Sequence, residues 1–79
     1  MKEKDFYQEQ VDIEKLKMKR KEKKVLQKDM AKILGCSTTT YCDKEKLRCR
    51  YTYSDIKKIK EYLGLTREET IDIFFKNIL

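Results

Sequence analysis

Apolar residues in this chain recur at the spacing of short amphipathic helices, and clear stop signals separate these helices. Met30, Ala31 and Leu34 fall on one helix face and predict a short helical segment that begins at Gln27. Gly35 follows directly, and a glycine in the left-handed conformation is common after the last turn of a helix. The pattern therefore predicts a helix that ends at this glycine.

A second short helix is predicted only two residues further on. Ser37 is a good N-cap, and Tyr41, one turn later, is the large apolar residue expected to face the core. We expect this helix to run from about Ser37 to Lys46. Two short helices joined by so tight a turn must cross steeply, which is typical of a helix-turn-helix motif.

Capping boxes predict two further helices in the C-terminal half. Thr52 with Asp55, and Thr66 with Glu69, have the spacing at which an N-cap hydroxyl and an acid each accept a bond from the other's backbone N–H. Gly64 is expected to end the first of these helices. The inward residues predicted are Ile56, Ile59 and Leu63 in one helix, and Ile71, Phe74, Phe75 and Ile78 in the other.

The N-terminal part of the chain divides into an irregular segment and one more helix. Residues 1–11 show no clear period and are interpreted as an arm or a frayed lead-in. Asp12 is a plausible N-cap for a helix whose inward side includes Ile13 and Leu16 and whose outward side is mostly lysine. The predicted fold is all-α, a compact bundle of about five short helices in one domain over residues 12–79.

Charge and chain length narrow the classes of function. The 79 residues carry 20 Lys and Arg against 14 Asp and Glu, a net charge of +6. Such a surplus attracts phosphate-rich partners or an anionic membrane surface. No apolar run approaches the ~18 residues of a membrane span and no signal peptide is recognisable, so we expect a cytoplasmic protein.

Enzymatic and metal-binding chemistry find little support in the sequence. The chain contains no His and no glycine-rich phosphate loop, so we expect a protein that is not an enzyme and binds no small-molecule cofactor. Cys36, Cys42 and Cys49 are odd in number and include no Cys-x-x-Cys pair. This predicts reduced thiols rather than a disulfide framework or a zinc site.

The stretch from Gln27 to Glu45 resembles the phage-repressor-like helix-turn-helix family, also called the XRE or lambda-repressor-like family. Ala31 lies where that family needs a small residue between crossing helices, Gly35 makes the turn, and Ser37 opens the recognition helix. The stretch from Asp55 to Glu69 resembles the family's fourth helix and the start of its fifth. The departures from the family pattern are Lys24, Leu26 and Lys44.

The resemblance implies that the helix from Ser37 to Lys46 lies in the major groove of DNA. This helix contains no Arg, Asn or Gln, so direct readout would rest on threonine hydroxyls and methyls, on Asp43 to cytosine and on Lys46 to guanine. The implied base contacts are Ser37, Thr38, Thr39, Cys42, Asp43 and Lys46, and the implied phosphate contacts are Gln27, Lys28, Lys44, Arg48 and Arg50.

The implied function is a sequence-specific transcriptional regulator of double-stranded DNA, of the small phage or mobile-element repressor type. The alternative is a protein–protein interaction module, such as an antitoxin or antirepressor, which should expose an apolar patch instead of a positive face. Ile73 and Leu79 fall outside the expected inward stripe, beside Phe75. They predict a homodimer through the C-terminal helix, with two recognition helices one duplex turn apart.

Overall fold

Five helices follow one another in the part of the chain that the computed structural model describes, residues 11–75, and no strand occurs there. The predicted all-α bundle is therefore confirmed. The predicted arm, apart from Val11, and the residues Ile78 and Leu79 lie outside the described range. The helices are α2 (Ile13–Glu22), α3 (Gln27–Leu34), α4 (Thr38–Glu45), α5 (Tyr53–Leu63) and α6 (Arg67–Phe74).

The helices begin at the capping residues that the sequence predicts. The Asp12 carboxylate accepts a bond from the backbone N–H of Lys15 at 3.3 Å, and Thr52 and Thr66 both form complete capping boxes. Leu26 precedes α3 without a hydroxyl, yet its own N–H donates to the Asp29 carboxylate at 3.0 Å. One of the two hydrogen bonds of a capping box is therefore present at α3, although its N-cap residue has no hydroxyl.

The helix ends use left-handed residues, and two of these are not glycine. Gly35 (φ 72°) and Gly64 (φ 67°) close α3 and α5 as predicted. Lys24 (φ 60°) and Leu47 (φ 61°) adopt the same conformation after α2 and α4. The backbone N–H of Lys24 donates to the Lys21 carbonyl at 2.9 Å, a hydrogen bond that a C-terminal glycine would also form. Lys24 therefore closes the helix as a glycine does, but its side chain makes the left-handed backbone conformation strained.

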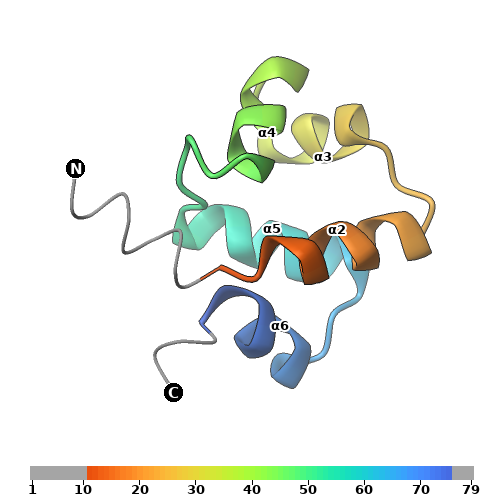
Figure 1. Cartoon of the computed structure of the whole chain (residues 1–79). Helices are drawn as coiled ribbons and strands as arrows, with labels where there is room; N and C mark the ends of the chain where they lie inside the picture. Colours follow the sequence, from red (N-terminus) through yellow and green to blue (C-terminus); the bar gives the residue numbers. More distant parts are fainter. Residues whose placement is uncertain (1–10, 76–79) are drawn as a thin grey trace.

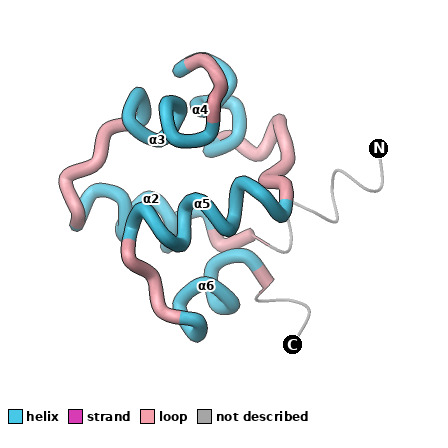
Figure 2. The backbone as a smooth tube through the Cα atoms, turned by 180° about the vertical axis from the view of Figure 1, so that it is seen from behind, coloured by secondary structure: helices cyan, strands magenta, loops and turns pink. Residues whose placement is uncertain are grey.

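The helices stack in three levels (Figures 1 and 2). In both views α2 and α5 lie across the middle, α3 and α4 on one side of them, and α6 on the other. The backbone N–H of Asp12 donates to the carbonyl of Ile73 at 2.6 Å, which ties the segment before α2 to α6. None of the described helices is long and apolar enough to cross a membrane.

Aromatic rings fill the centre between the levels. Tyr51 meets Tyr41 and Phe74 edge-on, with ring centroids 6.4 and 5.4 Å apart. Both tyrosine hydroxyls are buried without a hydrogen-bond partner in the described part of the chain. Loss of hydration on burial raises the pKa of Tyr41 and of Tyr51 above the ordinary value of 10.0.

The inward face of α6 differs from the predicted one. Ile73, expected outside the inward stripe, is 1 % exposed, whereas Ile71 and Phe75, expected inside it, are half-buried. Phe74 is buried as predicted. The helix is turned by about one residue, or roughly 100°, from the expected orientation. The prediction that Ile73 contributes to an exposed dimer patch is therefore wrong.

Candidate nucleic-acid interface

The α3 and α4 helices form the tight pair that the sequence predicts. Ala31 is buried where the helices cross, and the N–H of Cys36 bonds its carbonyl at 3.0 Å across the turn. The Ser37 hydroxyl accepts a bond from the backbone N–H of Thr40 at 3.1 Å and so fixes the start of α4. A small residue, a left-handed glycine and an N-cap thus set the angle between the two helices.

One face of α4 is buried and the other is open to solvent. Tyr41, Lys44 and Glu45 point into the protein. Thr39, about half a turn away from Tyr41, is exposed. Asp43 and Lys46, four and seven residues after Thr39, lie on the same side of the helix. The outer face of α4 therefore follows the line of Thr39, Asp43 and Lys46.

A buried ion pair fixes α4 to α2. The Arg20 Nε donates to Glu45 Oε2 at 2.8 Å and the Nη2 to Oε1 at 3.3 Å, a forked contact between side chains almost closed to solvent. Gln27 Nε2 donates to the same carboxylate at 2.9 Å, and Arg20 Nη1 donates to the Val25 carbonyl at 3.0 Å. One carboxylate thus joins α2, α3 and α4.

A second buried ion pair fixes α4 to α5. The Lys44 ammonium donates to Asp55 Oδ2 at 3.0 Å and to the Arg50 carbonyl at 2.8 Å, and it lies 5.9 Å from the centre of the Tyr51 ring. Lys44 is only 9 % exposed. The prediction that it lies on the phosphate-facing surface is wrong, because Asp55 and a loop carbonyl draw its charge inward.

The predicted base-contact residues differ in how far they are free to meet DNA. Thr38, Thr39 and Lys46 are exposed, and Asp43 is half-buried on the outer face. Ser37 is exposed, although its hydroxyl also donates to Thr40 Oγ1 at 2.9 Å. Cys42 is half-buried, and its thiol donates to Gln27 Oε1 at 3.1 Å, so it faces α3.

Three of the five predicted phosphate-contact residues are exposed on the α3 and α4 side. Lys28, in the first turn of α3, and Arg48 and Arg50, in the loop after α4, are all exposed. The amide of Gln27 is turned inward, with one end at Glu45 and the other at Cys42. The basic side chains that remain on this surface are therefore Lys28, Lys46, Arg48 and Arg50.

Sequence reasoning missed the role of Arg20. It is the single arginine in a lysine-rich run from Lys15 to Lys24, which the pattern presents as a solvated face. The residue type was a signal, because Arg forms forked contacts with a carboxylate whereas Lys acts as a point charge.

Comparisons of the chain with models of known protein families, with curated proteins and with solved structures gave no significant match.

Proposed function

We propose that this protein binds double-stranded DNA in a sequence-specific manner, with α4 in the major groove. The observation that supports this most directly is the two-sided construction of α4. Its inner face is held by two buried ion pairs, Arg20 with Glu45 and Lys44 with Asp55. Its outer face exposes hydroxyl and charged side chains, which are of the types that can bond base edges. Rigid support behind a polar, exposed helix is what groove reading requires.

The readout chemistry is modest for a DNA-binding helix. Thr38 and Thr39 offer hydroxyls and methyls at the start of α4, Asp43 fits a cytosine amino group, and Lys46 fits guanine. Because no forked Arg or amide contact is available on α4, discrimination per base pair is small. DNA shape and paired half-sites then contribute to specificity.

The alternative, a protein–protein module without DNA binding, predicts an exposed apolar patch on the α3 and α4 side. In the described range the exposed large apolar residues are Met18, Leu26, Tyr53 and Tyr62. None lies on α4, and Leu26, directly before α3, is a single residue rather than a patch. The exposed residues of α4 are instead hydroxylic or charged, and Lys28 in the first turn of α3 and Arg48 and Arg50 in the loop after α4 are exposed as well. This distribution favours a nucleic acid as the partner of the α4 side.

Selection from random duplexes tests the proposal. The chain should enrich a defined site, and Lys46→Ala should relax the base preference at one position of it. Arg67→Ala removes the same charge from an exposed residue of α6, on the far side of the molecule, and should leave the enriched site unchanged. Failure to enrich any site, or equal effects of the two substitutions, would refute the proposal.

The biological role proposed with this activity is regulation of transcription by occupation of an operator, as expected of a small phage or mobile-element repressor. The homodimer through the C-terminal helix stays a prediction, and Ile73 no longer supports it. Sedimentation equilibrium tests it, together with a comparison of single half-sites and inverted repeats. A monomer that binds both equally would exclude the dimer.

A further inference from the structure

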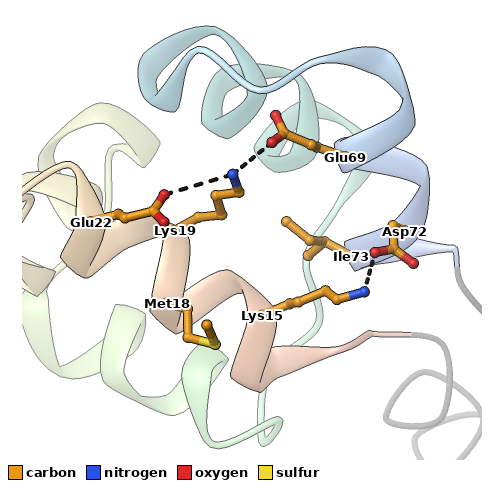
Figure 3. Close-up of a pocket in the computed structure, with 7 residues that line it drawn as sticks. All are labelled: Lys15, Met18, Lys19, Glu22, Glu69, Asp72 and Ile73. Atoms are coloured by element: carbon orange, nitrogen blue, oxygen red, sulfur yellow. Dashed lines mark hydrogen bonds and ion pairs between the residues drawn. The ribbon is translucent and has the colours of Figure 1, made fainter.

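Two grooves border α6, and their charges are arranged in opposite ways. In the groove between α2 and α6 the ammonium of Lys15 pairs with Asp72, and that of Lys19 lies 2.6 Å from Glu69 and 3.7 Å from Glu22 (Figure 3). These contacts, led by the hydrogen bonds, raise the pKa of Lys15 and Lys19. The charges of this groove are therefore compensated within the chain.

The groove between α5 and α6 has no such compensation. It encloses about 350 Å³ above an apolar floor that includes Ile56, Ile71 and Phe75. Among the described residues, its charged lining consists of Lys57, Lys60 and Arg67 and includes no acid. Among residues 11–75, none of these three cations has a carboxylate within ion-pair distance. An apolar hollow with a wholly basic rim remains.

We propose that this α5–α6 groove docks an acidic segment of a partner protein, with an aliphatic or aromatic side chain inserted against Ile71 and Phe75. The apolar floor provides the burial, and the three rim cations select carboxylates over cations. Tyr53, which lines the groove and is 78 % exposed, adds a residue type enriched at interface centres. The proposal goes beyond DNA binding and does not depend on it.

Other occupants fit these observations less well. A second copy that docked this groove onto itself would bring three cations against three cations. A DNA backbone would pair with the cations but gain nothing from Ile56, Ile71 and Phe75. An anionic bilayer is a broad surface, whereas this site is a hollow between two helices that accepts individual side chains.

A peptide display experiment on the full chain tests the proposal. Random peptides of about 11 residues, long enough for three helical turns, are selected on the chain and counter-selected on a Lys57→Glu, Arg67→Glu double variant. We expect enriched peptides that combine Asp or Glu with Leu, Phe or Trp. A synthetic peptide with an enriched sequence should bind the chain at least tenfold more tightly than the same peptide in which Gln and Asn replace Glu and Asp.

The matched control is Lys21→Glu, Lys58→Glu, which makes the same charge change at exposed residues that do not line the groove. This variant should keep peptide binding, and NMR shift changes should centre on Ile71 and Phe75. Both double variants should keep the wild-type circular dichroism spectrum, which separates lost docking from lost folding.

Several results would overturn the proposal. They are enrichment without acidic bias, equal loss in both double variants, shift changes on the α4 side, self-association mapped to the groove, or binding to phosphatidylserine vesicles without peptide enrichment. Failure of the duplex selection leaves this proposal intact, because its readout contains no DNA.

Discussion

Replacement of Arg20 by Met removes the cation from the buried pair and leaves the Glu45 carboxylate, 3 % exposed, inside the protein. Breaking a buried pair from one side costs about 3–5 kcal/mol. Gln27 still donates to Glu45 at 2.9 Å, so we expect a loss near the lower limit, about 3 kcal/mol. At 0.05–0.15 kcal/mol per residue, a domain of 79 residues has a total stability of roughly 4–12 kcal/mol.

Urea unfolding followed by circular dichroism measures this loss. The double variant Arg20→Met, Glu45→Met should recover to within about 1 kcal/mol of the wild type, because no unpaired charge is left in the protein. Lys15→Met breaks the solvent-exposed pair with Asp72 and should leave the urea midpoint unchanged. If Arg20→Met were as stable as Lys15→Met, or if the double variant were no better than the single one, the Arg20–Glu45 pair would not hold α4 as described.

Four further outcomes follow from the same structure. Lys24→Gly should raise stability by about 0.5–1 kcal/mol, a few degrees in Tm, because glycine relieves the left-handed backbone; a lower Tm would contradict this. Gly35→Val should lower stability by about 1–2 kcal/mol through backbone strain alone, since the space around an added Cβ is open, and calorimetry without DNA measures it. DNA affinity should fall steeply with salt, with a log–log slope of ~0.9 per phosphate neutralised, and a flat dependence would argue against nucleic acid. Thr39→Ala should alter preference at particular base pairs, whereas Lys28→Ala should weaken all sequences alike; the reverse would mean that another helix reads the DNA.

Local signals in the sequence were sufficient to define the helices. Asp12, Ser37, Thr52 and Thr66 each cap the helix that their position predicts, because a cap acts on backbone groups only three residues away. Gly35 likewise ends its helix for a local reason, its freedom at positive φ. Features set by neighbouring backbone atoms were therefore predictable without knowledge of the fold.

Features set by distant residues were not predictable in this way. The inward position of Lys44 depends on Asp55, 11 residues later, and on a carbonyl in the intervening loop. The orientation of α6 was ambiguous, because Phe74 can share a helix face either with Ile71 and Phe75 or with Thr70 and Ile73. Packing of α6 on α2 and α5 decides between them, and that packing exists only in three dimensions.

The two phenols buried at the centre of the fold, which have no hydrogen-bond partner among residues 11–75, make its stability sensitive to alkaline pH. Burial raises the pKa of Tyr41 and Tyr51 in the folded chain, so the unfolded chain releases these protons first, near pH 10.0. Below pH 10.0 both states hold these protons, and the free energy of unfolding does not depend on the two phenols. Above that pH the unfolded chain loses the protons first, so the free energy of unfolding declines as the pH rises. Each phenol adds a slope of at most about 1.4 kcal/mol per pH unit, about 2.7 together, so the free energy of unfolding should fall as the pH rises above 10.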